Sequence, residues 1–490
     1  MQGLAGCYGE CDRQLVQRML DRIRHRGPDA FKIVEADGVV LGSRALARHL
    51  GGKTRCAAEE DGVVVTADSY IYNKSELLQE YFGSKAEPAI TDVELLLEMY
   101  RSAGLDMFGL IDGAYAIAIV DGSKLVLARD RFGIKPLYHS GSSKNGSYSS
   151  EMKSQVAAGS DFAPFPAGKI FVQGQGMKNI GDLPARRTSD KEKPEDALRR
   201  LALSSTDQCV ENSDSVNILL DGGINSSAIA AAASFTTVDI DTVCVGLAES
   251  EELELARQVA AHLGTSHMER VFEQEDVLQT LDEAIYAVES FDFPQVRNCI
   301  PDYMAAHLFL HPNRTTLVGE GGDEIFAGYD YLNTIKSDSK LRNERARILA
   351  SGSSTSYQRV DRVNASACLD GRMPFMQASI VDLGLGLGRR DLIGAGPNQN
   401  KLVLRKAFEK LLPKDLVWRR EPKHSDGVSS MGVLRNYAEE VISDKEFEKE
   451  RKVLPKGRIR TKEELMYFRS FQKFFHSKSC YDAVGLTESL

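Results

Sequence analysis

The chain has 490 residues, of which 42% are hydrophobic and 27% charged, and its formal net charge is −9. This length predicts two or three domains with ordinary cores, and the composition excludes a mainly disordered or fibrous protein. The mild acidity argues against nucleic-acid binding, and no apolar run approaches the roughly 18 residues that a membrane helix needs.

The first residues and the cysteines bear on the cellular compartment. The first seven residues contain no basic stretch followed by an apolar one, so we expect no signal peptide. The eight cysteines are scattered without a CxxC pair, which is typical of free thiols in a reducing environment. We therefore predict a cytoplasmic protein that binds neither membranes nor nucleic acids.

Residues 1–182 are predicted to form an α+β domain. Short aliphatic runs predict strands at 38–41, 62–65, 115–120 and 125–128. Asp121-Gly122 predicts a hairpin turn between the last two strands. Helices are expected at about 12–25 and 91–103. Together these elements indicate layers of helix and antiparallel sheet.

A charged linker at 181–196 leads into a second domain, predicted over 195–490. The expected elements are strands at 216–220, 242–246 and 315–318, and a helix at 251–264 that ends at Gly264. The alternation of strand and helix predicts a parallel sheet covered by helices on both faces. After about residue 330 the pattern is mainly helical.

Two loops in this second half carry residues suited to chemistry. The first, 221–227, follows a strand with a Gly-Gly turn at a helix N-terminus, an arrangement that binds phosphate but also occurs in ordinary tight turns. The second, 319–329, follows another strand, and such loops converge on one crevice of a parallel sheet. Its Glu320, Asp323 and Glu324 have the side chains of magnesium ligands and of a general base.

In this order the two loops resemble those of glutamine-dependent asparagine synthetases, which carry Ser-Gly-Gly-x-Asp-Ser-Ser and Gly-Glu-Gly-x-Asp-Glu. Further motifs match that family along nearly the whole chain. They are His25-Arg26-Gly27-Pro28-Asp29, Thr91-Asp92-Val93-Glu94, Leu110-Ile111-Asp112-Gly113, the run 128–138, Ser150-Glu151-Met152-Lys153, Asp361-Arg362, Gly371-Arg372-Met373-Pro374-Phe375, Leu404-Arg405-Lys406 and Ser425-Asp426-Gly427-Val428.

The resemblance implies an α/β fold in two parts. The N-terminal part would be a glutaminase-type α+β sandwich of four layers with antiparallel sheets. The C-terminal part would be an adenine-nucleotide α-hydrolase-like synthetase domain with a parallel sheet and a helical C-terminal region. In the family the first domain hydrolyses glutamine and ammonia passes through an internal tunnel. The second domain adenylates aspartate with ATP and magnesium, and ammonia then displaces AMP to give asparagine.

The resemblance also assigns roles to residues. The positions at the nucleotide are Asp221, Gly222, Gly223, Asn225, Ser226, Ser227, Val245, Gly319 and Gly321. Asn225 and Asp323 fall at magnesium positions, and Glu320 falls at a catalytic position. Arg44, Asp68 and Asp92 fall at positions of the glutamine site.

The glutaminase positions depart from the family pattern. The family nucleophile is a cysteine directly after the initiator methionine, but this chain has Gln2, whose carboxamide cannot serve as such a nucleophile. Cys7 is predicted in the first strand, out of reach of the site. Asp68 replaces an asparagine of the oxyanion hole and brings negative charge to a place where negative charge must develop. Arg44 and Asp92 are retained.

The synthetase positions depart as well. Asp221 replaces the first serine of the pyrophosphate loop, unless it is an ordinary helix N-cap, and Asn225 replaces the metal-binding aspartate. Glu421 replaces the catalytic lysine that stabilises charge on the phosphate, which reverses the sign at that position. With one or two residues of slippage, Lys423 or Arg420 would substitute for it.

These departures predict a pseudoenzyme, that is, a binding or regulatory subunit that forms a homodimer or pairs with an active paralogue. We expect ATP, aspartate or glutamine as its small-molecule ligands, with weakened Mg-ATP binding and no tightly bound cofactor. The alternative is an ammonia-dependent asparagine synthetase or a related ATP-dependent amide-forming ligase. A purely structural role is the third reading.

Overall fold

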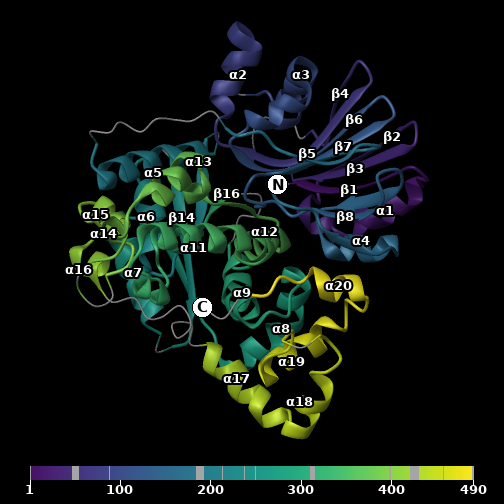
Figure 1. The fold of residues 1–490 in the computed structure, drawn as a ribbon. Helices are drawn as coiled ribbons and strands as arrows, with labels where there is room; N and C mark the ends of the chain where they lie inside the picture. The colour runs from purple at the N-terminus through teal and green to yellow at the C-terminus, as the bar shows by residue number, and fades with distance from the viewer. Residues whose placement is uncertain are drawn as a thin grey trace.

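The structure is a computed structural model and describes residues 2–46, 55–87, 89–183, 192–211, 213–236, 238–248, 250–309, 315–394, 396, 399–419, 430–455 and 457–487. Figure 1 shows two parts side by side, with the strands of the N-terminal part in purple to blue and the remainder in teal to yellow. Within these ranges, every helix is too short or too polar to cross a membrane.

The N-terminal part contains two six-stranded antiparallel sheets. The first has the strand order β10-β8-β9-β1-β3-β2, with β1 (Gln2–Tyr8), β2 (Ala30–Ala36), β3 (Val39–Ala45), β8 (Tyr138–Gly141), β9 (Gly146–Ser149) and β10 (Phe162–Pro164). The second has the order β12-β11-β7-β6-β5-β4, with β4 (Ala58–Glu60), β5 (Val63–Ile71), β6 (Gly113–Asp121), β7 (Lys124–Arg129), β11 (Lys169–Val172) and β12 (Gly176–Asn179).

These sheets pack face to face and are covered by helices on their outer faces. Leu4, Leu41 and Leu127 are among the buried residues between the sheets. Helices α1 (Arg13–Arg22) and α4 (Met152–Ala158) cover the first sheet, and α3 (Asp92–Ala103), with α2 (Lys74–Phe82) beside it, covers the second. This arrangement confirms the predicted four-layer sandwich with antiparallel sheets.

Local sequence explains how these helices begin and end. Asp12 caps α1 by accepting a hydrogen bond from the Gln14 amide at 2.8 Å, and α1 ends at Arg22, earlier than predicted, because the chain tightens into a 3₁₀ turn at Arg24–Arg26. Thr91 and Glu94 form a capping box that starts α3, with the Thr91 amide donating to Glu94 Oε2 at 2.8 Å.

The C-terminal part is built on a parallel sheet with the order β15-β14-β13-β16-β17. Its strands are β13 (Ser215–Leu219), β14 (Asp239–Gly246), β15 (Ser266–Val271), β16 (Thr315–Leu317) and β17 (Asp370–Arg372). Because β14 and β16 lie on opposite sides of β13, the direction of the strand order reverses there. Such a switch point opens a crevice at the carboxyl ends of the strands.

Helices pack around this sheet and continue beyond it, and they make up most of the remaining residues that the structure describes (Figure 1). They are α5 (Pro194–Val210), α6 (Ile224–Ala233), α7 (Glu251–Leu263), α8 (Gln274–Val288), α9 (Phe293–Ala306), α10 (Gly322–Phe326), α11 (Asp338–Ser351), α12 (Ser356–Ser366), α13 (Ala378–Gly386), α14 (Arg389–Leu392), α15 (Leu402–Phe408), α16 (Lys414–Trp418), α17 (Ser430–Val441), α18 (Asp444–Glu450), α19 (Lys462–Phe471) and α20 (Lys478–Ala483). The predicted parallel sheet with helices is thus confirmed.

The region after about residue 330 is mainly helical, as predicted, with one strand in addition. β17 is formed by Asp370-Gly371-Arg372, which pair in parallel with β16 at the edge of the sheet. None of these three residue types favours strands, so pairing with β16 and not local propensity makes this segment extended.

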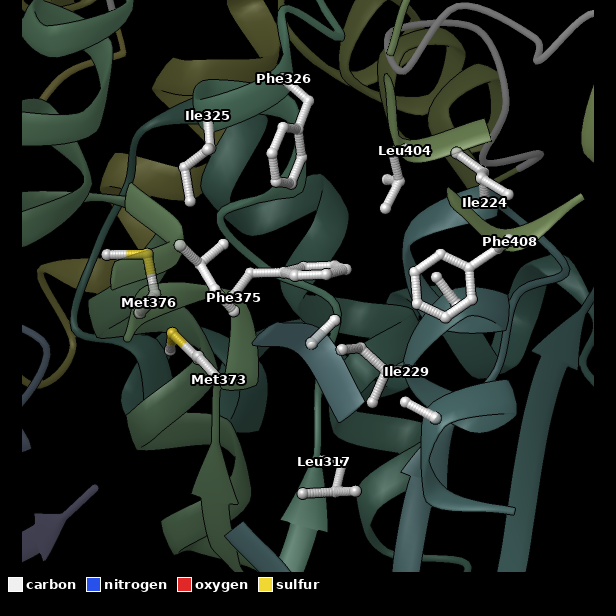
Figure 2. Packing of buried hydrophobic residues seen from close by; sticks show 14 of the residues in the cluster. Ile224, Ile229, Leu317, Ile325, Phe326, Met373, Phe375, Met376, Leu404 and Phe408 are labelled. Atoms are coloured by element: carbon white, nitrogen blue, oxygen red, sulfur yellow. The ribbon is translucent and has the colours of Figure 1, made fainter. Parts of the chain in front are cut away.

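A hydrophobic cluster beneath the crevice fixes the elements around it. Its members in Figure 2 include Ile224, Ile229, Leu317, Ile325, Phe326, Met373, Phe375, Met376, Leu404 and Phe408, all nearly fully buried. In Figure 2, Leu404 and Phe408 of α15 lie on the same side as Ile224 of α6, and the ring of Phe375 lies in the middle of the cluster. Helices α6, α10 and α15 are therefore packed around one core.

A buried network of ion pairs joins the two parts. The guanidinium of Arg26 is fully buried and lies 2.7 Å from Asp68, 2.8 Å from Glu151 and 2.7 Å from Asp361 of α12. Lys135 lies 3.0 Å from the second oxygen of Asp361. Burying charges is costly unless each has partners, so these pairs hold the parts in one relative orientation.

Hydrogen bonds to backbone carbonyls and one C-terminal helix reinforce this contact. The Tyr72 hydroxyl donates to the Met373 carbonyl at 2.8 Å, and Arg129 Nη2 donates to the Ser353 carbonyl at 2.9 Å. Helix α20 returns to the N-terminal part, where it packs beside β10.

We predict that Arg26→Met destabilises the whole protein. Three buried carboxylates would lose a shared cation, a loss that typically costs about 3–5 kcal/mol. Urea unfolding followed by circular dichroism measures the change. The control is Arg24→Met, at an exposed position of the same turn, which should leave the free energy of unfolding within about 0.5 kcal/mol of the unmodified chain. Equal effects of the two substitutions would contradict the proposed role of the network.

Candidate functional site

The two loops predicted to carry chemistry meet at the crevice between β13 and β16. A Cβ added at Gly322 would lie 2.6 Å from Asn225 Oδ1, and one at Gly319 would lie 2.7 Å from the Asn225 carbonyl carbon. Glycine is required at both positions because the loop after β16 presses directly on the first turn of α6.

The carboxylate of Asp221 turns back into its own loop. It accepts hydrogen bonds from the Gly223 amide at 2.9 Å and from the Ser226 hydroxyl. The N-cap of α6 is Gly223, so the alternative that Asp221 is the N-cap residue is wrong. Gly222 has φ +71° and leaves no room for a side chain against Leu255 of α7, which explains the Gly-Gly turn.

Asn225 and Asp323, predicted at magnesium positions, are in direct contact. Asn225 Nδ2 donates to Asp323 Oδ2 at 2.6 Å. Lys401 Nζ lies 3.0 Å from Asp323 Oδ1 and donates to Asn225 Oδ1 at 3.3 Å. This triad of Lys401, Asp323 and Asn225 is nearly enclosed, with the lysine side chain 6% and the aspartate 14% exposed.

This arrangement does not fit Mg²⁺. The ion takes about six oxygen ligands in octahedral geometry and favours carboxylates. Here each carboxylate oxygen of Asp323 faces a nitrogen, and the side-chain amide oxygen of Asn225 faces the ammonium group of Lys401. Among the described residues, no group of three or more acidic, histidine or cysteine side chains has the arrangement of a metal site.

Glu320 lies beside the triad and is paired with Arg359 of α12 at 3.2 Å. Arg359 also binds Asp302. Burial and the carboxylates of Glu324 and Asp323 raise the pKa of Glu320 to about 8, while the guanidinium 3.2 Å away acts in the opposite direction. The carboxyl group is thus surrounded by acids on one side and held by arginine on the other.

The remaining predicted nucleotide positions lie around these groups. Ser226 and Ser227 are buried in the first turn of α6, Gly321 has φ +92° at the start of α10, and Val245 is near the carboxyl end of β14. Arg419 Nη2 donates to the Gly222 carbonyl at 3.2 Å.

The position at which the sequence analysis predicts that Glu421 replaces a catalytic lysine falls outside the described residues. Glu421 and its two candidate substitutes, Arg420 and Lys423, all belong to this segment.

At the predicted glutamine site, Gln2 is held by hydrogen bonds on every side. Its backbone N–H donates to Asp68 Oδ1 at 2.9 Å, and its backbone carbonyl accepts from Arg26 Nε at 3.1 Å. Its side-chain Oε1 accepts from Ser43 Oγ at 3.2 Å, and its Nε2 donates to the Arg55 carbonyl at 3.3 Å. A side chain engaged in this way is a structural element of the site.

Two retained residues of this site are paired within the chain. Arg44 Nη2 donates to Asp21 at 2.6 Å. Asp92 accepts from Lys74 Nζ at 2.8 Å and from Ser69 Oγ at 2.9 Å. The amine and carboxylate of a free amino acid would have to compete with Lys74 and Asp21 for these groups.

Asp68 is fully buried and ionised. Burial alone would raise its pKa, but Lys135 at 3.5 Å and Arg26 at 2.7 Å lower the pKa to about 2. The negative charge predicted from the sequence is therefore present and neutralised by two cations. Cys7 lies buried in β1, in the predicted first strand.

Comparison with known families fits this geometry. A family model described as a glutamine amidotransferase domain matches residues 1–164. A model described as asparagine synthase matches residues 197–355 and 333–479, which is more than half of the chain. The chain belongs to the asparagine synthetase family.

Curated relatives in this family match over almost the full chain. The glutamine-hydrolyzing asparagine synthetase B of Escherichia coli (strain K12) is 27% identical over 94% of this chain and 88% of its own length. The probable asparagine synthetase of Dictyostelium discoideum is 27% identical over 96% and 92%, and asparagine synthetase 2 of Oryza sativa subsp. japonica is 28% identical over 97% and 86%.

Among solved structures, a glutamine phosphoribosylpyrophosphate amidotransferase from B. subtilis is 13% identical over 78% of this chain and 92% of that chain, with a TM-score of 0.33.

Sequence reasoning missed the cations that complete both sites. Lys401 stands three residues before the Leu404-Arg405-Lys406 motif, and nothing local marks it, because only the fold brings it to Asn225. Lys74 was missed for the same reason. Arg26 belongs to the His25-Arg26-Gly27-Pro28-Asp29 motif. Its place in a family motif was the one available signal that Asp68 has a buried cationic partner.

We predict that Asp68→Asn lowers stability at neutral pH and lowers it less in acid. A group whose folded pKa is depressed stabilises the protein above its unfolded pKa of about 4, and this contribution disappears as the pH falls towards the folded value of about 2. A lowering of this size corresponds to about 2 kcal/mol at pH 7.

Urea unfolding between pH 7 and pH 3 measures the free energy of unfolding of the unmodified chain and of Asp68→Asn. The difference between these two free energies should become smaller below pH 4. The control, Asp37→Asn at an exposed turn, should show no such narrowing. A pH-independent difference for Asp68→Asn would refute the assignment of a buried, ionised carboxylate.

Proposed function

We propose that this asparagine synthetase family member is a pseudoenzyme that has lost glutamine hydrolysis and amide synthesis and acts as a binding or regulatory subunit. The observation that carries the proposal is that the charged groups expected to meet substrates are paired with other side chains of the chain itself. Substrates bind to groups that are solvated or weakly paired in the free protein, because displacing a built-in partner reduces the net gain of binding.

The N-terminal half supports this proposal through Gln2 and Asp68. A carboxamide at position 2 offers no thiolate or hydroxyl to attack the glutamine amide. The carboxylate of Asp68 stands where the family uses an uncharged amide donor, so it would oppose an oxyanion. Arg44 and Asp92 are paired with Asp21 and Lys74, so neither is open to one end of a free amino acid.

The C-terminal half supports the proposal through Asp221. Its carboxylate accepts the hydrogen bonds of Gly223 and Ser226, which are donors that a pyrophosphate would need. A phosphate ligand would meet a like charge at this loop. Glu421 adds a second acid, by sequence, where the family has a lysine.

The second candidate function is ammonia-dependent amide synthesis by adenylation of a carboxylate. The retention of Glu320, Asp323 and Glu324 in the family order favours it, because a carboxyl group with a raised pKa is suited to proton transfer. It requires Mg-ATP to bind despite Asp221 and the lysine at the metal position.

The proposed ligands and partners follow from the same family. We propose ATP, aspartate or glutamine as weak ligands, with Mg-ATP affinity below that of an active synthetase. A homodimer or a complex with an active paralogue would give a catalytically inert chain a regulatory role.

We predict no pyrophosphate release above the blank when the full chain is incubated with aspartate, ammonia and Mg-ATP, and no glutamate release from glutamine. The Escherichia coli relative serves as the positive control in both assays. Pyrophosphate release that is lost on Glu320→Ala would overturn the pseudoenzyme proposal and support the ligase. Glutamate release lost on Gln2→Ala would overturn its glutaminase part.

Restoring the family residues should strengthen nucleotide binding. The triple substitution Asp221→Ser, Asn225→Asp and Glu421→Lys changes the summed charge of the three positions from −2 to 0 and restores a carboxylate for a metal ion, so we expect ATP affinity to rise by at least about tenfold. Isothermal titration calorimetry with Mg-ATP measures it. An unchanged affinity would mean that the nucleotide does not bind at these loops.

A further inference from the structure

We propose that the ammonium group of Lys401 is the resident cation of the Lys401–Asp323–Asn225 triad, so that the two loops are closed without a divalent metal. The inference deepens the proposed function and rests on its placement of the nucleotide site at these loops. It concerns which cation lies against Asn225 and Asp323, which the loss of turnover alone does not determine.

In the triad each hydrogen-bond donor faces an acceptor, and the ammonium group faces the carboxylate. Asp323 Oδ1 lies 3.0 Å from Lys401 Nζ, and Asp323 Oδ2 accepts from Asn225 Nδ2 at 2.6 Å. The amide oxygen of Asn225 then accepts from the same ammonium at 3.3 Å. One lysine, one carboxylate and one amide thus form a closed ring of hydrogen bonds with no net charge.

An aspartate at position 225 would change this balance. Two carboxylates and one ammonium carry a net negative charge, which attracts a divalent cation, whereas the observed triad is neutral. The amide also donates a proton to Asp323 where a carboxylate could only accept. The asparagine therefore favours the lysine as the neighbour of Asp323 and disfavours a metal ion.

Packing holds Lys401 in this position. Leu404 and Phe408 of α15 are fully buried in the cluster that contains Ile224 of α6, and Figure 2 shows these side chains together. Asn400, the residue directly before the lysine, donates from Nδ2 to the Gly328 carbonyl at 3.0 Å. A Cβ at Gly328 would overlap Asp323 Oδ1, so that side chain is confined as well.

Electron paramagnetic resonance of Mn²⁺, a divalent probe for this site, tests the proposal on the full chain without nucleotide. At millimolar Mn²⁺ we expect the unmodified chain to leave the signal of free Mn²⁺ unchanged. We expect the same result for Asp323→Asn. A bound Mn²⁺ per chain that Asp323→Asn removes would overturn the proposal.

The double variant Asn225→Asp, Lys401→Met should acquire a Mn²⁺ site, with affinity at least about tenfold above that of the unmodified chain. The matched control, Asn225→Asp with Lys406→Met, changes an exposed lysine on the same helix and keeps Lys401. It should change Mn²⁺ affinity less than threefold. Equal Mn²⁺ binding by both double variants, or by neither, would count against the lysine as the resident cation.

Circular dichroism establishes that each variant is folded. If the double variant does not fold, the unmodified chain and Asp323→Asn still decide the question. The outcome is separable from that of the turnover assays, because these titrations contain no substrate: a Mn²⁺ site without pyrophosphate release overturns only this inference, and release without a Mn²⁺ site overturns only the proposed function.

Discussion

The guanidinium of Arg26 is the point on which the geometry of both halves depends. Its three carboxylate partners come from β5, from the residue before α4 and from α12, so a single side chain ties the two sheets of the N-terminal part to the C-terminal part. Its Nε also binds the carbonyl of Gln2, which sets the start of β1. Because these charges are buried, the alternatives to this arrangement are strongly disfavoured.

Internal pairing recurs at two described positions that the sequence analysis predicts to depart from the family pattern. Asp68 is balanced by Arg26 and Lys135, and Asn225 accompanies a lysine beside Asp323. In each case the substituted residue is not an isolated defect, because a neighbouring side chain satisfies it. A protein that only accumulated damage would leave unpaired charges at such positions, and these would weaken the fold. The structure is consistent with continued selection for a folded chain.

The fold was largely readable from the sequence, and the state of the site was not. The Asp121-Gly122 turn and the runs around it predicted the β6–β7 hairpin because turn residues and strand periodicity act locally. β17 was missed because its extended form depends on pairing with a distant strand. At the site, the residues that differ from the family pattern could be identified from the sequence, but their partners could not. Lys401 is 176 positions from Asn225 along the chain, and no local pattern carries information over that separation.

The loop that starts α6 has one more consequence. Asp221 and the hydroxyl of Ser226 are five positions apart on the same rigid turn, so the carboxylate is permanently tethered beside the donors that it occupies. A tethered group acts at an effective concentration set by geometry, which for short connections reaches millimolar values or more. A dissolved phosphate has to displace the Asp221 carboxylate from these two donors before it can bind them. Any anion that needs the Gly223 amide and the Ser226 hydroxyl therefore has to compete with an acceptor that the chain itself supplies.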